Sequence, residues 1–253
     1  MTLDKEKSLR NKYLQNAYLP LGLMGFAITT VLLSLYNLRI FSTAASPVTE
    51  AWAIVFISVC ALVLGGSIQF IAGLRTIHYG HQKTGSILAT FGGFWLIYGT
   101  FQLLLNLAPL DGTTLAGKNP AAGVPAHAPN FIRAIVAVFL FLYGVICIVS
   151  LYISMHKNII TSLIFFTLIV AFFTLGIGDA IAGSGAATQT AFRAKLRAAN
   201  AFQVIGGVFG LAAGFSAFYL AWAVILVNIF KKPILPFGKP ILKPRDASVQ
   251  LGD

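Results

Sequence analysis

The stretch AWAIVFISVCALVLGGSIQFIAGL, residues 51–74, contains no charged side chain and is long enough to cross a bilayer as one helix. Glu50 precedes it and Arg75 follows it, so charges flank the apolar run on both sides. Inside a bilayer the backbone amides must find partners within their own segment, which makes a helix the expected form. The stretch therefore predicts a transmembrane helix.

Five other apolar segments of similar length accompany this one: residues 19–36, 85–107, 134–155, 159–181 and 201–230. Hydrophobic residues make up 57% of the 253-residue chain and charged residues 10%, whereas a soluble domain is roughly 25% charged. A soluble fold of this composition would expose large apolar patches. We therefore expect an all-α membrane protein, with six transmembrane helices per protomer around a narrow pore. Its parts would be an N-terminal arm (1–18), the six-helix domain (19–230) and a tail (231–253).

The basic residues predict the orientation of the bundle. Six spans place both termini on one side, and twelve of the 18 Lys and Arg residues then fall on that side. The positive-inside rule favours cytoplasmic termini and a multi-pass protein of the plasma (inner) membrane. The net charge of +11 is thereby explained by topology, and we expect no nucleic acid as a partner. An alternative for the first span is a cleaved signal peptide ending near Thr43-Ala44-Ala45, but its apolar stretch is longer than such peptides usually have.

The connections between the spans differ in character. Residues 108–130 are rich in Pro, Gly and Ala and predict an irregular loop, while residues 191–197 suggest a short interfacial helix. Small residues recur every four positions at Gly206, Gly210 and Gly214, which is typical of helices that pack closely in a membrane.

The predicted spans contain no Lys, Arg, His or Glu, and the sequence assembles no catalytic triad. The four histidines, His78, His81, His127 and His156, all fall in loops. Gly176-Ile177-Gly178-Asp179 lies inside a membrane helix rather than after a strand, so it does not predict a dinucleotide loop. We expect neither an enzyme nor a bound cofactor or metal. Asp179 is the one acidic residue within a span, and Gln69 is the deepest amide, so both are candidates for lining a pathway.

The first span carries the most specific motif. Asn16-Ala17-Tyr18-Leu19 leads into Pro20-Leu21-Gly22-Leu23-Met24-Gly25-Phe26, which resembles the Asn-Pro-Ala-Pro-Leu-Gly-Leu signature of the acetate uptake transporter family, the succinate–acetate permeases. The match covers about residues 16–238. It continues through Thr29-Thr30 to Asn37, Gly65-Gly66, Gln69, Ala72-Gly73, Phe94-Trp95, Phe165-Phe166, Leu168, Ser216-Ala217, Tyr219 and Leu235-Pro236-Phe237-Gly238.

This resemblance implies a transporter or channel for acetate, succinate and related small carboxylates, working with protons and assembled as a homohexamer in membrane lipids. It implies a pore constriction at Phe26, Phe91 and Leu168. These residues lie at similar depths, roughly 9–14 Å from the starts of their predicted helices at about 1.5 Å per residue. The expected substrate pathway comprises Pro20, Leu21, Gly22, Leu23, Thr29, Thr30, Gln69, Ala217 and Tyr219.

The sequence also departs from the family pattern. The first proline of the signature is absent, Phe91 stands where the family usually has Tyr, and Asp179 stands where it usually has Asn. The loss of a hydroxyl at Phe91 affects how a carboxylate would be handled. Asp179 adds a possible proton acceptor or a repulsive charge near the outer mouth.

The residues suggest a mechanism and leave rivals open. If Pro20 lies in the first turn of its helix, the free backbone N–H groups and the helix dipole favour a carboxylate there. Hydrogen bonds from Gln69, Thr29 and Tyr219 would replace part of its lost hydration. An apolar ring disfavours a bare carboxylate, so we expect a proton to accompany it. The alternatives are a channel for a small neutral solute such as urea or ammonia, and a membrane scaffold without a pathway.

Overall fold

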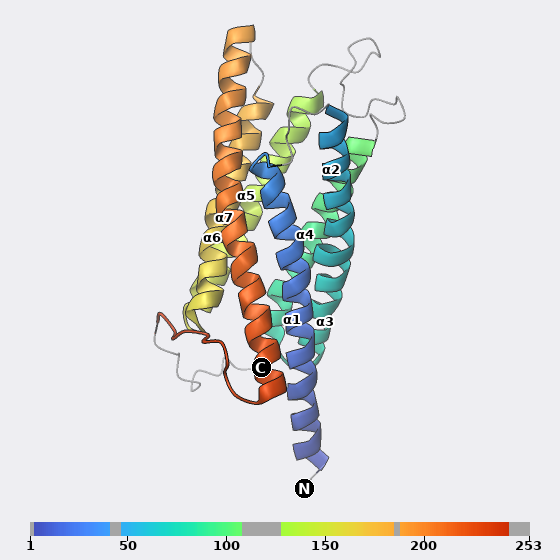
Figure 1. The fold of residues 1–253 in the computed structure, drawn as a ribbon, viewed down its shortest axis with the longest axis vertical. Coiled ribbons are helices and arrows are strands. Elements are labelled where there is room, and N and C mark those ends of the chain that lie inside the picture. The colour runs from blue at the N-terminus through green and yellow to red at the C-terminus, as the bar shows by residue number, and fades with distance from the viewer. Residues whose placement is uncertain (1–2, 41–46, 108–127, 185–187, 243–253) are drawn as a thin grey trace, which may run out of the picture.

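Six helical spans run alternately up and down in the computed structural model, which describes residues 3–40, 47–107, 128–184 and 188–242 (Figure 1). In chain order the helices are α1 (Leu3–Asn37), α2 (Pro47–Cys60), η1 (Ala61–Ile68), α3 (Gln69–His78), α4 (Gln82–Leu107), α5 (Ala128–Ser154), α6 (Ile159–Gly183) and α7 (Gln189–Phe230). All six predicted spans are present, with α2, η1 and α3 together forming the second, so the expected all-α fold is confirmed. Most of the predicted 108–130 loop, and Thr43-Ala44-Ala45, lie outside the described residues.

The two ends of the bundle differ. The last residues of α1, α4 and α6 and the first residues of α2, α5 and α7 lie at one end, here called the loop end. The opposite end holds the start of α1, the end of α7 and the tight turns α3–α4 and α5–α6, and is here called the termini end (Figure 1).

Helix α1 corrects the expectation for Pro20. The helix begins at Leu3, so Pro20 lies in its interior rather than in a first turn. Residues 3–17 are rich in Lys, Glu, Leu, Arg and Gln, which are strong helix formers and extend the helix beyond the apolar part. Pro20 therefore does not leave a set of free N–H groups for a carboxylate. Its missing N–H instead leaves the carbonyl of residue 16 without its usual partner.

The middle of the second span is a π-helix, Ala61–Ile68. Gly65 and Gly66 lie within it and are buried. A methyl group added to Gly25 of α1 would overlap the Leu64 carbonyl oxygen, so the two backbones touch where α1 crosses η1. Such widened turns occur frequently at functional sites, and sequence periodicity did not predict this one.

Helix α7 is longer than expected. It begins at Gln189, so the predicted interfacial helix 191–197 and the predicted span 201–230 are one continuous helix of 42 residues. Ala198, Ala199 and Ala201 lie at the junction, and alanine is the strongest helix former. At about 1.5 Å per residue the helix is roughly 63 Å long, and it projects beyond its neighbours at the loop end (Figure 1).

The spans form two groups that face each other. In one, α5, α6 and α7 pack in sequence, and in the other α4 packs against the second span. Helix α1 joins the groups, because it packs on α7 and on the second span. On the far side of the bundle, aromatic rings connect α4 to α5. Phe94 stacks on Phe139 with ring centroids 5.4 Å apart, and the Tyr143 hydroxyl donates to the Thr90 carbonyl at 3.1 Å.

The small residues of α7 pack inside the chain. Gly206 faces Leu175 of α6, while Gly210 and Gly214 face Ser34 and Val31 of α1. The repeat therefore brings helices of one protomer together.

The described tail crosses the termini end as an irregular segment, 231–242, here called the strap. The Tyr219 hydroxyl of α7 donates to the Pro236 carbonyl at 2.9 Å. The backbone N–H groups of Ile241 and Leu242 both donate to the Met155 carbonyl at 2.9 Å. Phe237 packs against the apolar core. The strap thus ties the end of α7 to the α5–α6 turn, as the red segment in Figure 1 shows.

Candidate functional site

A cavity of about 490 Å³ lies between the two groups of helices and reaches towards the loop end. Its size is within the range of small-molecule sites, roughly 300–1,000 Å³. Residues of α1, α2, α4, α5, α6 and α7 contribute to its walls. The cavity therefore lies inside the bundle of a single chain.

The deep end of the cavity is apolar. Phe26, Leu168 and Phe172 line it, and each side chain is at most 5% exposed. Phe91 contacts this group. Its ring lies edge-on to the Phe26 ring, with centroids 6.1 Å apart, and its centroid is 6.3 Å from that of Phe172. The structure thus places the three predicted constriction residues in one buried cluster, in which Phe26 and Leu168 line the cavity and Phe91 packs on Phe26.

The helix geometry gives the depth of this apolar end of the cavity, here called the floor. Phe26 lies 11 residues before Asn37 on α1, and Leu168 lies 11 residues before Asp179 on α6. Asn37 and Asp179 also line the cavity, near the loop end of their helices. At about 1.5 Å per residue, Phe26 and Leu168 lie roughly 16 Å below the level of Asn37 and Asp179. This charged end of the cavity is here called the mouth.

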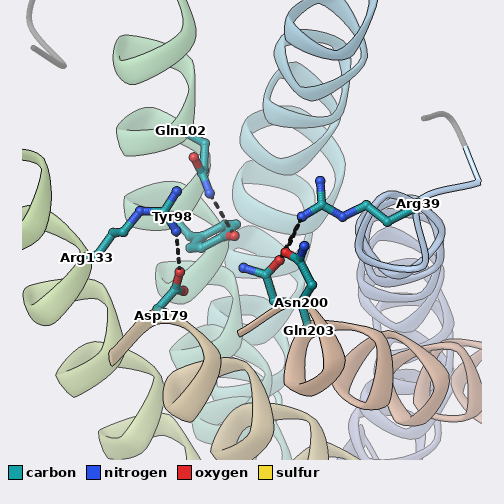
Figure 2. A network of polar contacts seen from close by, with 7 residues as sticks. All are labelled: Arg39, Tyr98, Gln102, Arg133, Asp179, Asn200 and Gln203. Carbon is teal, nitrogen blue, oxygen red and sulfur yellow. Dashed lines mark hydrogen bonds and ion pairs between the residues drawn. The ribbon is translucent and has the colours of Figure 1, made fainter. Parts of the chain in front are cut away.

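The mouth of the cavity carries the charged residues of its lining. Of the described residues that line it, the charged ones are Arg39, Arg133 and Asp179. The Arg133 guanidinium pairs with the Asp179 carboxylate, with Nη1 and Oδ1 3.3 Å apart. Arg39 Nη2 donates to the side-chain oxygens of Asn200 and Gln203 at 2.9 and 3.2 Å. Figure 2 shows these two groups on either side of Tyr98, whose hydroxyl accepts a hydrogen bond from Gln102 at 2.8 Å.

One polar atom in the cavity wall lacks a partner. Trp95 of α4 lines the cavity and is 3% exposed, and its indole Nε1 has no hydrogen-bond partner among the described residues. Its ring packs on Gly65 of the π-helix. A buried donor of this kind usually has a partner in a native protein, either a protein group or a bound molecule.

The predicted polar residues of the pathway are only partly brought together. Thr30 lines the cavity, but its hydroxyl donates to the Phe26 carbonyl at 2.7 Å. Thr29 is fully buried behind the wall and donates to the Gly25 carbonyl at 2.9 Å. Gln69 is 2% exposed and does not line the cavity, and its Oε1 has no partner among the described residues.

The remaining predicted pathway residues lie elsewhere. Pro20 and Gly22 are buried in the termini half of α1, Leu23 is half-buried, and Leu21 is 48% exposed on the outside of the bundle. Ala217 is fully buried in the core. Tyr219 is bonded to the strap at the termini end, far from the mouth.

Several residues of the site were missed by the sequence reasoning: Arg39, Arg133, Asn200, Gln203, Trp95, Tyr98 and Gln102. For Arg133 the sequence did contain an indication that it pairs with Asp179. Helices α5 and α6 form a hairpin, and Arg133 and Asp179 are each 23 residues from His156 in its turn. Equal distance from a tight turn places two residues opposite each other on antiparallel helices, so the pairing was predictable once both helices were assigned.

Among the described residues, no group of three or more His, Cys, Asp or Glu side chains could hold a metal ion. The arrangement is suited to admitting a small solute. A charged mouth raises the local concentration of ions of opposite charge, and an apolar floor hinders water and hydrated ions.

Comparison with known proteins identifies relatives of this architecture. The GPR1/FUN34/yaaH family matches residues 6–236. The chain is 29% identical over 220 residues to the succinate-acetate/proton symporter SatP of Escherichia coli K12, covering 87% of this chain and 94% of that protein. It is 32% identical over 206 residues to the ammonia transport outward protein 2 of Saccharomyces cerevisiae, covering 81% of this chain and 60% of the yeast protein.

A solved structure shares the fold. The structure of the bacterial acetate channel SatP superposes with a TM-score of 0.64 at 28% sequence identity, covering 87% of this chain and 98% of that one. The six-span bundle is therefore the SatP channel fold.

Proposed function

Because this chain belongs to the GPR1/FUN34/yaaH family of multi-pass membrane transporters, which are not enzymes, we propose that it carries acetate and related small carboxylates across the membrane together with a proton. The observation that carries the proposal is the cavity. It joins a mouth with two arginines to an apolar floor at Phe26 and Leu168.

The charge distribution in the cavity favours a small carboxylate over a cation. Arg39 and Arg133 outnumber Asp179 among the described lining residues, so the mouth carries a net positive charge. A positive mouth concentrates anions. The methyl group of acetate is compatible with the apolar lining below, whereas larger hydrated ions are not.

The apolar floor is the reason for proposing that a proton crosses the membrane with the carboxylate. Phe26, Phe91 and Leu168 offer no charge and no hydrogen-bond donor to a carboxylate, and each is at most 5% exposed. Moving an ionised carboxylate through such a ring without a compensating partner is very costly. A protonated acid avoids this cost. The SatP relative is named as a symporter of succinate and acetate with protons, which agrees with this proposal.

The decisive experiment measures labelled acetate uptake into proteoliposomes with and without an imposed pH gradient. We expect an inward proton gradient to accelerate uptake, and propionate to compete while urea does not. A voltage-driven acetate current that is insensitive to pH would contradict proton linkage, because a bare anion would then be crossing the floor.

A second candidate substrate is ammonia, since the yeast relative is named for ammonia transport. An uncharged floor also admits a small neutral molecule. The same vesicles separate the two substrates. Rapid alkalinisation of the lumen on addition of ammonium, without acetate uptake, would favour ammonia as the substrate. Acetate uptake that ammonium does not inhibit would favour the carboxylate.

Substitution of Phe26 tests whether the cavity is a pathway. Phe26→Ala widens the floor, so we expect butyrate uptake to rise relative to acetate uptake by at least about tenfold, the lower end of the effect of one methylene group in an apolar pocket. Phe56→Ala is the matched control, because Phe56 is 63% exposed on the outside of the bundle. Permeation at background for both variants and for the wild type would favour a scaffold without a pathway.

Two further features belong to the proposal. We place both termini in the cytoplasm because twelve of 18 basic residues fall on that side, and activity of fusion reporters at the C-terminus tests this.

We propose a homohexamer from the family resemblance. The mass of the detergent-solubilised particle tests this oligomeric state.

A further inference from the structure

We propose that Arg133 is the outer binding site for the substrate carboxylate, and that Asp179 occupies it as an internal competitor until a proton displaces it. This inference rests on the proposed function and specifies how the substrate enters. It assigns a binding role to Arg133 and a proton-accepting role to Asp179.

The geometry of the pair supports the competition. Arg133 Nη1 lies 3.3 Å from Asp179 Oδ1, and the two side chains are 48% and 19% exposed. The guanidinium is therefore open to the cavity, while the carboxylate that it holds is mostly enclosed. A guanidinium carries five donors in a planar fork that fits a carboxylate. Acetate presents the same chemical group as Asp179, so the two compete for the same donors.

The second arginine of the mouth is held differently. Arg39 donates to the neutral oxygens of Asn200 and Gln203, and no carboxylate of the described residues pairs with it. Figure 2 shows Arg39 on the opposite side of the mouth from Arg133. Arg39 therefore attracts an anion at any pH, whereas the availability of Arg133 depends on Asp179.

The surroundings of Asp179 explain why a proton follows the anion. The charged and titratable groups of the described lining around it are Arg133 of α5, which pairs with it, Tyr98 of α4, and Tyr36 and Arg39 across the mouth at the end of α1. Helix α7 contributes Gln203, Gly206 and Gly210 to this lining and no charge. Asp179 also lies one turn before the end of α6 at Gly183, where the helix dipole is negative.

Linkage follows from this arrangement. When an incoming carboxylate takes Arg133, Asp179 loses its cation partner beside apolar walls and a negative helix end, so binding of a proton replaces the lost interaction. By reciprocity, a proton on Asp179 strengthens binding of the carboxylate to Arg133 to the same extent. The substrate and one proton therefore enter the mouth together.

The test is the pH dependence of acetate affinity, measured by calorimetry on the purified full-length protein between about pH 6 and about pH 8, where acetate stays ionised. For the wild type we expect tighter binding as pH falls, by up to about tenfold per pH unit, the limit for one linked proton. Asp179→Asn should bind acetate at every pH as tightly as the wild type does at low pH. Binding in two buffers of different ionisation enthalpy should reveal proton uptake by the wild type and none by Asp179→Asn.

Two arginine variants complete the experiment. Arg133→Gln should weaken acetate binding and abolish its pH dependence, whereas Arg39→Gln should weaken binding and keep the wild-type slope. An Asp179→Asn variant that retains the wild-type slope, or that folds but binds no acetate, would overturn the competition. Failure of the proposed function is seen separately, as a wild type that neither binds nor takes up acetate.

Discussion

At the scale of single residues, the site combines side chains that have no charge with a few that do. Phe91 is one of the three residues that the family resemblance implied for the constriction. Its ring contacts four others, with centroids 5.9–6.3 Å away, from Phe26, Tyr143, Phe165 and Phe172. The nearest hydroxyl in this group, that of Tyr143, already donates to the Thr90 carbonyl. The floor therefore has no free donor among these aromatic residues.

Adding a hydroxyl beside the floor should change how the protonated acid is held. For Phe91→Tyr we expect apparent acetate affinity to increase about fivefold, since a hydrogen bond between neutral groups contributes about 1 kcal/mol. Phe165→Tyr is the control, because Phe165 is buried beside Phe91, whereas the Phe91 ring itself contacts Phe26 and Phe172 of the cavity lining. Concentration dependence of uptake in proteoliposomes measures both variants. Equal affinities in the two variants would show that the hydroxyl does not reach the substrate.

At the scale of elements, the π-helix is the feature with the largest effect on the site. Its wider turn brings the Leu64 carbonyl onto Gly25 of α1, and it places Gly65 against the Trp95 ring and the Thr29 hydroxyl. Glycine is required at both crossing points, because a Cβ atom would overlap the facing group. The Trp95 ring of the cavity wall thus packs on the same π-helix whose backbone touches α1.

A pair of glycine substitutions tests this dependence. Gly25→Ala should lower the free energy of unfolding by about 1–3 kcal/mol, since overpacking forces the two helices apart. Gly93→Ala is the matched control. A Cβ atom there meets nothing within 4 Å, so we expect no loss and a gain of up to about 1 kcal/mol from helix propensity. Thermal unfolding in detergent measures both, and equal melting temperatures would contradict the predicted contact.

The sequence predicted the number of the spans, and their extent to within a few residues for all but α7, because apolar length and flanking charge indicate which segments cross a bilayer. The residues of the floor were suggested by family resemblance, and their common depth followed from helical rise. The π-helix, the junction within α7 and the partners of Arg39 were not predictable in this way. They depend on which faces of the helices meet. In a membrane, both the lipid-facing and the buried faces are apolar, so the apolar pattern of the sequence carries little information about which faces pack together. For Tyr219 the residue type indicated a polar contact, but not that the partner is the Pro236 carbonyl.

At the scale of the whole molecule, the strap fastens the helices of one group, α5, α6 and α7, to each other at the termini end. The strap connects α7 with the α5–α6 turn through hydrogen bonds at Pro236 and Met155, and Phe237 packs on the core. The cavity opens towards the opposite end. The strap therefore stabilises the termini end, while the mouth at the loop end is formed by side chains on separate helices.

Truncation tests the contribution of the strap. A chain that stops after Ile234 loses three hydrogen bonds to the bundle, each contributing about 1 kcal/mol, and also the packing of Phe237. We expect a clear drop in its melting temperature. A chain that stops after Leu242 keeps each of these contacts and should melt like the full-length protein. An equal drop in both chains would mean that the stabilising contacts lie beyond residue 242.

The placement of Trp95 has a practical consequence. The chain has three tryptophans; Trp52 and Trp222 are 56% and 51% exposed on the outside of the bundle, whereas Trp95 is 3% exposed in the cavity wall. Replacing the two outer residues with phenylalanine would leave a single native fluorophore beside the solute route. Its emission would then report occupancy of the cavity in real time, without a chemical label.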